Sequence, residues 1–212
     1  MFPIRDSIPS RTTPFFTYAL IAVNIVVFIH ELRLGVGIED FLKTYALIPV
    51  VWTPTTLVSS MFLHGGWMHM LGNVWSLWIF GDNVEDRLGH FRYLVFYFFC
   101  GVMAGAGHLV TNVGSSIPTI GASGAIAGVM GAYFVLFPRA KVLTLFPIFI
   151  IPIWFEIPAV LYLGFWFFTQ LRSGLGGLGP AFEAIAWWAH IGGFVAGIYF
   201  AVRFVKPRKK QS

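Results

Sequence analysis

Two residues in this sequence have the side chains that a serine hydrolase needs. Ser123 lies in the segment GASGA, at residues 121–125, and His190 lies in AHIGG, at residues 189–193. A serine hydroxyl is a weak nucleophile until a neutral imidazole within hydrogen-bond reach removes its proton. We therefore take Ser123 as a candidate nucleophile and His190 as its candidate general base.

A second pair of polar residues could stabilise an oxyanion. His69 and Asn73 lie four residues apart in HGGWMHMLGN, residues 64–73, so on a helix they share one face. Both side chains can donate hydrogen bonds, which acyl transfer requires where negative charge develops on the carbonyl oxygen. The N–H of Ser123 is a third candidate donor, because the first N–H groups of a helix have no intrahelical acceptor. No acidic residue lies near Ser123 or His190 in sequence, which favours a two-residue dyad over a triad.

These candidates lie in apolar segments, which indicate helices that cross a membrane. The chain is 57% hydrophobic and 11% charged, whereas a soluble domain carries about 25% charged residues. Most of the apolar stretches approach or exceed the roughly 18 residues that a spanning helix needs. They cover residues 14–33, 66–81, 91–112, 123–137, 142–171 and 185–205. We predict an all-α fold, a polytopic membrane bundle of six transmembrane helices forming one domain over residues 1–212.

Prolines, glycines and amphipathic patterns predict the connections. Residues 34–64 form a long amphipathic outer connection that we expect to lie in the membrane interface. The segment GDNVEDRLG, residues 81–89, predicts a cytoplasmic turn. Prolines at 147, 152 and 158 interrupt the fifth stretch, so we expect an interfacial lead-in and then a helix over residues 157–171. The segment RSGLGGLGP, residues 172–180, predicts a flexible outer loop.

The basic residues predict the orientation. Arg33, Lys43 and Arg172 lie in one set of connections, and the other 11 of the 14 Lys and Arg residues lie in both tails and the alternate connections. This positive-inside bias places the N-terminal segment 1–13 and the basic tail 206–212 in the cytoplasm. The same distribution explains the net charge of +5 by contact with the lipid bilayer, so we expect no nucleic-acid partner.

The depth of the candidate residues is similar on three helices. Ser123 lies 16 residues before Arg139, and His190 lies 13 residues before Arg203. Helical rise puts them about 24 and about 20 Å above those cytoplasmic charges, and His69 reaches a similar level on its own helix. The fourth stretch, about 22 Å long as a helix, cannot cross a hydrocarbon layer of about 30 Å. Ser123 should therefore begin a helix on the floor of a recessed, water-filled pocket.

Taken together, HGGWMHMLGN, GASGA and AHIGG resemble the three signature segments of the rhomboid proteases, in the family's order. The resemblance implies a six-helix core, a dyad of Ser123 and His190, and an oxyanion site formed by His69, Asn73 and the Ser123 amide. It also implies transmembrane protein substrates that are cut near the outer end of a single helix. We expect no cofactor and no metal ion. Short loops suggest a multi-pass protein of a prokaryotic plasma membrane.

Two further predictions concern the support of the histidine ring and the role of the helix in the fifth stretch. The family often has an aromatic residue four positions after the serine, stacked under the histidine, whereas this chain has Ala127. The ring must be supported otherwise, by Phe134, by Tyr133 or by an aromatic side chain from another helix. The aromatic run 165–168 is expected to face lipid, and the resemblance suggests that this helix is a lateral gate for substrate.

Two other functions compete with proteolysis. One is a catalytically silent relative that only binds transmembrane helices, against which the intact Ser123 and His190 argue. The other is a haem- or metal-binding membrane protein that uses His69, His108 and His190. The sequence lacks HExxH, and a histidine-ligated site would leave the turn before Ser123 unexplained.

Overall fold

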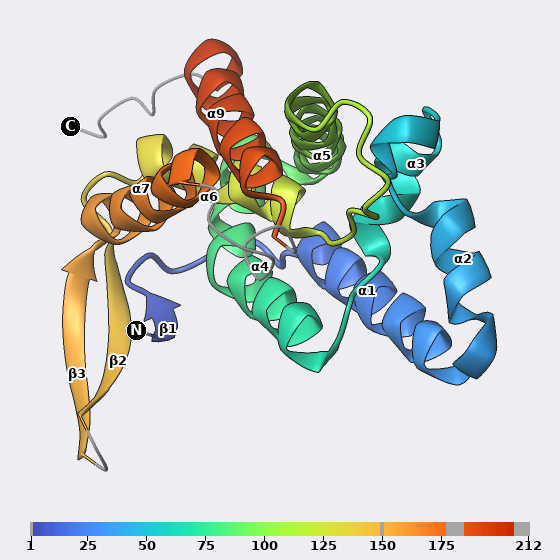
Figure 1. Cartoon of the computed structure of the whole chain (residues 1–212). Helices are drawn as coiled ribbons and strands as arrows, with labels where there is room; N and C mark the ends of the chain where they lie inside the picture. Colours follow the sequence, from blue (N-terminus) through green and yellow to red (C-terminus); the bar gives the residue numbers. More distant parts are fainter. Residues whose placement is uncertain (1, 149–150, 177–184, 206–212) are drawn as a thin grey trace.

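The computed structural model describes residues 2–148, 151–176 and 185–205, and Figure 1 shows helices packed around a central one. The long helices are α1 (Phe15–Arg33), α4 (Trp67–Leu88), α5 (His90–Thr111), α6 (Ser123–Leu136), α7 (Ala159–Gly176) and α9 (Trp187–Phe204). Two of them, α1 and α5, are long and apolar enough to cross a membrane by length and composition. The prediction of a helical bundle is confirmed, and the number of membrane crossings stays a prediction.

Helix α6 forms the centre of the bundle. It is buried continuously from Gly124 to Tyr133 and contacts α4, α5, α7 and α9. A helix that is apolar all round is expected to be enclosed by its neighbours, and Figure 1 shows α6 among them. The first residue of this enclosed helix is Ser123, so the fold holds that side chain in a fixed position.

Helices α6 and α9 pack with their backbones in direct contact. A Cβ atom added to Gly193 would overlap the carbonyl oxygen of Gly124, and one added to Gly197 would overlap that of Gly128. Small residues at four-residue spacing permit this approach, as they do in other membrane helix pairs. The consequence is that Ser123, at the start of α6, lies beside His190, in the first turn of α9.

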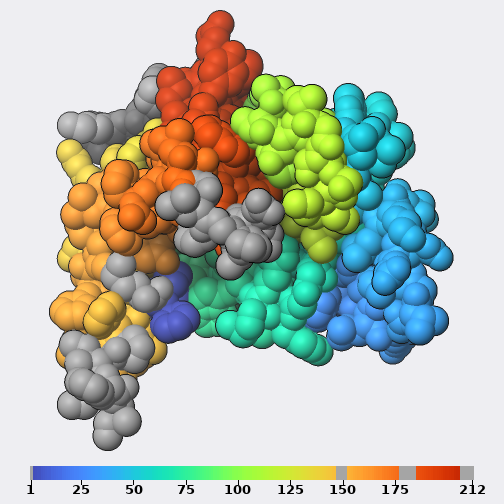
Figure 2. Space-filling view, viewed as in Figure 1, coloured from blue at the N-terminus to red at the C-terminus, as the bar shows by residue number. Residues whose placement is uncertain are grey.

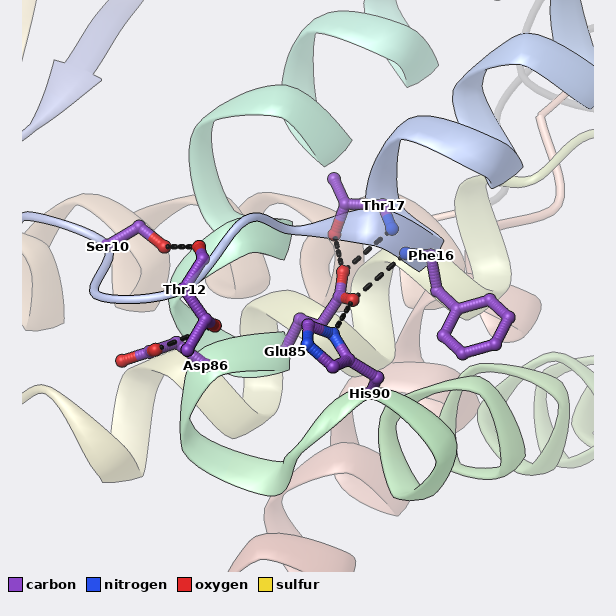
Figure 3. Close-up of polar contacts among 7 residues, drawn as sticks. All are labelled: Ser10, Thr12, Phe16, Thr17, Glu85, Asp86 and His90. Atoms are coloured by element: carbon purple, nitrogen blue, oxygen red, sulfur yellow. Dashed lines mark hydrogen bonds and ion pairs between the residues drawn. The ribbon is translucent and has the colours of Figure 1, made fainter.

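Glu85 joins the start of α1 to the junction of α4 and α5, as Figure 3 shows. Its fully buried carboxylate accepts hydrogen bonds from the N–H groups of Phe16 and Thr17, at 2.9 and 2.8 Å. The hydroxyl of Thr17 and Nδ1 of His90 also bind it, at 2.8 and 2.6 Å. Glu85 thus supplies acceptors for N–H groups that the first turn of α1 leaves unpaired.

The turn predicted at residues 81–89 is wrong in its extent. Helix α4 continues through this segment to Leu88, and the chain turns only at Gly89, whose φ of 81° lies in the region that favours glycine. The polar residues of the segment are compatible with a helix because they lie at its end and bond to the neighbouring elements. Asp86, for example, accepts a hydrogen bond from the hydroxyl of Thr12 (Figure 3).

The segment predicted as an interfacial lead-in to the fifth helix folds as part of a small antiparallel sheet. Strands β2 (Lys141–Ile148) and β3 (Ile151–Pro158) form a hairpin, and β1 (Phe2–Asp6) pairs with β2, giving the order β1-β2-β3. Figures 1 and 2 show this hairpin extending away from the helices. Three prolines exclude a helix here, and the β-branched and aromatic residues between them suit strands. Pro147 and Pro152 lie opposite each other in the register.

The connection at residues 34–64 lies beside α1 and α5 (Figure 1). It contains the short helices α2 (Ile38–Tyr45) and α3 (Thr56–Ser59) and the 3-10 turns Gly35–Gly37, Pro49–Val51 and Ser60–Phe62. Helix α7 extends to Gly176, beyond the predicted end at residue 171. The rest of the predicted flexible loop, at 177–180, and the basic tail at 206–212 lie outside the described residues.

Candidate active site

Ser123 and His190 lie within hydrogen-bond distance of each other. The distance between Nε2 of His190 and Oγ of Ser123 is 2.8 Å, which is typical of a well-formed hydrogen bond. Gly121, with a φ of 122°, turns the chain immediately before α6. Helix α6 begins two residues later at Ser123, whose side chain meets that of His190 although 67 residues separate them.

The pair lies in a cavity of about 1140 Å³, whose walls include Ser123, His190, His69 and Asn73. Helix α6 contributes the serine, α9 the first histidine, and α4 the second histidine and the asparagine. The structure therefore brings together all four residues that the sequence pattern singled out. A cavity of this size with polar side chains in its wall can hold the water that hydrolysis consumes.

The Asn73 side chain is a donor without an acceptor. Its Nδ2 is buried and has no hydrogen-bond partner among the described residues, although it lines the cavity. Leaving a buried polar group unpaired is costly, so such an atom is informative when it faces a ligand site. The amide can donate to an oxygen atom of a molecule that enters the cavity.

The hydrogen bonding of His69 also leaves an N–H donor that faces the space beside Ser123. Its Nδ1 lies 3.4 Å from the backbone N–H of Gly65, which can only donate, so Nδ1 accepts. In the neutral ring, Nε2 then carries the proton. A Cβ built on Gly121 would lie 2.6 Å from Nε2 of His69 and 3.6 Å from Oγ of Ser123, so the two atoms face the same small space. Any side chain at position 121 would block it.

Two residues of the site come from α7 and were not among the sequence candidates. The Oε1 atom of Gln170 lies 2.7 Å from Nδ1 of His190, and Gln170 is only 6% exposed. The ring of Trp166 lies 5.9 Å from the His190 ring, centroid to centroid, with 36° between the planes. A glutamine inside an apolar stretch was a signal for Gln170, because strongly polar residues in spans are functional candidates.

The support for the His190 ring therefore comes from another helix, one of the three options that Ala127 left open. Trp166 fills this role. The ring of Trp187 lies edge-on to the His190 ring, with 6.3 Å between the ring centroids and 89° between the ring planes. Tyr133 packs against Phe80 and Phe137, and Phe134 packs against Phe194. The expectation that residues 165–168 all face lipid is wrong for Trp166 and Phe167, which are partly buried against the core.

His108 lies in the wall of the cavity and stabilises it through hydrogen bonds. Its Nε2 lies 2.7 Å from the hydroxyl of Thr119, and its Nδ1 lies 3.2 Å from Nδ2 of Asn112. Both ring nitrogens are engaged in fixing the loop that leads to α6. Within the described part of the chain, no three His, Cys, Asp or Glu side chains gather as metal ligands would.

Comparison with known proteins gives one family and several relatives. A family model described as the Rhomboid domain matches residues 51–207. The chain is 27% identical over 203 residues to Rhomboid protein 1, mitochondrial, of Saccharomyces cerevisiae, covering 92% of this chain and 54% of that protein. It is 30% identical over 204 residues to Rhomboid protease GluP of Bacillus subtilis, covering 92% of this chain and 36% of GluP.

A third relative is similar to this chain over a shorter segment. The presenilin-associated rhomboid-like protein, mitochondrial, of Mus musculus is 27% identical over 147 residues, or 68% of this chain and 36% of that protein. The chain thus spans about half or less of the length of the curated relatives it matches.

Proposed function

This chain belongs to the rhomboid family, and we propose that it is an intramembrane serine endopeptidase with Ser123 as nucleophile and His190 as general base. Family membership makes it an integral membrane protein with an intramembrane-protease or rhomboid-like function. One observation carries the more specific proposal, namely the 2.8 Å contact between Ser123 Oγ and His190 Nε2 inside the cavity. A rhomboid-like protein that only bound helices would not need this contact.

The reaction follows from the atoms that meet in the cavity. Nε2 of His190 takes the proton of Ser123 as Oγ attacks the carbonyl carbon of the scissile bond. The negative charge that forms on the carbonyl oxygen is stabilised by Nδ2 of Asn73, Nε2–H of His69 and the N–H of Ser123. His190 then gives the proton to the leaving amine, and the serine acyl ester remains.

The second half of the reaction uses water from the cavity. His190 removes a proton from a water molecule, whose oxygen attacks the acyl carbon, and the same three donors stabilise the second oxyanion. Ser123 regains its proton from His190 and the acid product leaves. The cavity is needed because the ester would otherwise lie in a hydrocarbon layer that holds no water.

The substrates and location are part of the same proposal. The substrates are membrane proteins that present the end of a transmembrane helix to the cavity. The chain is one multi-pass domain in a prokaryotic plasma membrane, with both termini in the cytoplasm, as the positive-inside bias predicts.

The test is incubation of the purified full chain, in liposomes, with a model single-span substrate, and identification of the products by mass spectrometry. We expect one cut near the outer end of the substrate helix, and no cut with Ser123→Ala. Ser10→Ala is the matched control, because the hydroxyl of Ser10 donates to the carbonyl of Thr12 within the N-terminal segment. A folded wild-type protein that binds the substrate helix without cutting it would support the silent relative instead.

A further inference from the structure

Gln170 takes no part in the proposed proton transfers or in the proposed oxyanion site, although its side chain contacts His190. It lies on α7, between residues that are mostly apolar, and 94% of its surface is buried. Burying an amide side chain costs free energy unless its polar atoms are paired. The hydrogen-bond partners of Gln170 therefore indicate its role.

The direction of each hydrogen bond around Gln170 follows from its neighbours. The carbonyl oxygen of Trp166 can only accept, and it lies 3.4 Å from Nε2 of Gln170. The hydroxyl of Thr169 donates to the same carbonyl at 2.6 Å, so its oxygen is free to accept from Nε2 of Gln170 at 3.2 Å. With the NH₂ group directed to these two acceptors, Oε1 of Gln170 must face His190.

The same reasoning fixes the tautomer of His190. Because Oε1 of Gln170 has no proton, Nδ1 of His190 must donate across the 2.7 Å contact. In a neutral ring this leaves Nε2 unprotonated, and Nε2 is the atom that lies 2.8 Å from Oγ of Ser123. The proton of Ser123 then points to Nε2, which is the arrangement that a general base requires.

We propose that Gln170 is the positioning residue of the catalytic dyad, which holds His190 in the tautomer and orientation that accept the serine proton. This inference rests on the proposed function. Trp166, four residues earlier on α7, packs against the same ring and restricts its tilt. The arrangement has the geometry of a triad in which a neutral amide takes the place of the acidic residue.

The catalytic dyad and the residues that support it come from different helices. Ser123 and His190 come from α6 and α9, which pack backbone to backbone, whereas Gln170 and Trp166 both come from α7. Any movement of α7 away from α9 removes the acceptor and the ring support together. The competence of the base therefore depends on a third helix being in place.

The experiment compares Gln170→Met, which removes the acceptor at similar size, with Gln170→Glu, which keeps it. Leu163→Met is the matched control, because Leu163 is fully buried on the same helix and is not one of the residues that line the cavity. Cleavage kinetics give kcat and KM separately. Nitrogen-15 NMR of histidine-labelled protein gives the tautomer of His190, whose signals are assigned as those missing from His190→Ala.

In the wild type we expect neutral His190 to be protonated at Nδ1. Gln170→Met should lose about 10- to 100-fold in kcat with little change in KM, within the contribution that a positioned base makes. Its His190 signals should show the other tautomer or a mixture. Gln170→Glu should keep most of the activity and the Nδ1–H tautomer. Its carboxylate stabilises the imidazolium, so the acidic limb of the pH–rate profile should move to higher pH.

Three results would overturn the proposal. One is a wild-type spectrum with His190 protonated at Nε2, and this readout holds even if Gln170→Met does not fold. Another is Gln170→Met with unchanged kcat and unchanged tautomer. The third is an equal loss of kcat in Leu163→Met. A wild-type chain that cleaves no substrate would count against the proposed function, while its NMR spectrum would still decide the role of Gln170.

Discussion

At the scale of single residues, the cavity wall carries hydrogen-bond donors that suit the proposed oxyanion site. Nδ2 of Asn73 has no acceptor among the described residues, and the bond from Gly65 leaves Nε2 of His69 as the protonated nitrogen of the neutral ring. Donors fixed in advance are effective in catalysis because they need not reorganise as the charge develops. In the proposed mechanism, the buried amide of Asn73 gains a hydrogen-bond acceptor when the oxyanion forms.

Asn73→Ala should lower kcat by about 10- to 1000-fold, because one of three oxyanion donors is lost while the others remain. KM should change little, since the donor acts on the intermediate rather than on the bound substrate. Steady-state cleavage assays measure both constants, and unfolding in detergent checks that the variant is intact. Unchanged kcat in a folded Asn73→Ala protein would remove this residue from the oxyanion site.

The residue types and their spacing were sufficient to predict four side chains that line one cavity. Ser123, His190, His69 and Asn73 each lie in a short polar or glycine-containing segment, and their depths matched. Gln170 and Trp166 could not be assigned in the same way. A lone glutamine in an apolar helix indicates a buried contact. The partner of that glutamine depends on the rotation of α7 about its axis and on the packing of α7 against α9. Neither can be inferred from the local sequence.

At the scale of the elements, the contact between α6 and α9 positions the dyad. Gly193 and Gly197 of α9 lie directly against backbone carbonyl groups of α6, so that no Cβ atom fits between the two helices. The first turn of α9 is thereby fixed relative to the first turn of α6. An increase in the distance between the helices would also move His190 from Ser123.

Gly197→Ala should destabilise the bundle by about 1 to 3 kcal/mol, because the added methyl group overlaps the carbonyl oxygen of Gly128. Cleavage should fall as the helices separate. Gly164→Ala is the matched control on α7, where the nearest neighbour of an added Cβ is the Phe134 ring at 3.8 Å. There the better helix propensity of alanine should give a neutral or slightly stabilising effect.

Unfolding in a titration with sodium dodecyl sulfate, followed by circular dichroism, measures both glycine variants. Equal midpoints for Gly197→Ala and Gly164→Ala would show that the close approach of α6 and α9 does not limit stability.

Hydropathy predicted where the long helices lie, but not the sheet. The stretch 142–171 is mostly apolar, and hydropathy alone does not distinguish a buried strand from a helix segment. Pro147, Pro152 and Pro158 indicated where the helix could not extend. The pairing of β2 with β1 could not be inferred, because it joins residues more than 130 positions apart along the chain.

At the scale of the whole molecule, the charge distribution makes a prediction that is independent of the site. The positive-inside bias places residues 1–13 in the cytoplasm and the connection 34–64 outside. Thr13 and Val36, one in each segment, are both exposed in the structure. They therefore offer labelling positions at the two ends of α1.

Thr13→Cys should react with a membrane-impermeant maleimide only in inside-out vesicles, and Val36→Cys only in right-side-out vesicles. The native Cys100 provides the background control, because it is fully buried and should stay unlabelled while the protein is folded. Labelling of both positions from the same side would contradict the orientation and the assignment of α1 as a spanning helix.

The central claim is that His190 activates Ser123 in the folded, membrane-embedded chain, and a fluorophosphonate probe measures it directly. The probe forms a covalent bond to an activated serine oxygen with loss of fluoride. Mass spectrometry of the labelled protein should find the adduct on Ser123 in the wild type, none in Ser123→Ala, and little in His190→Ala. A folded wild-type protein that stays unlabelled, or equal labelling of His190→Ala, would contradict the account.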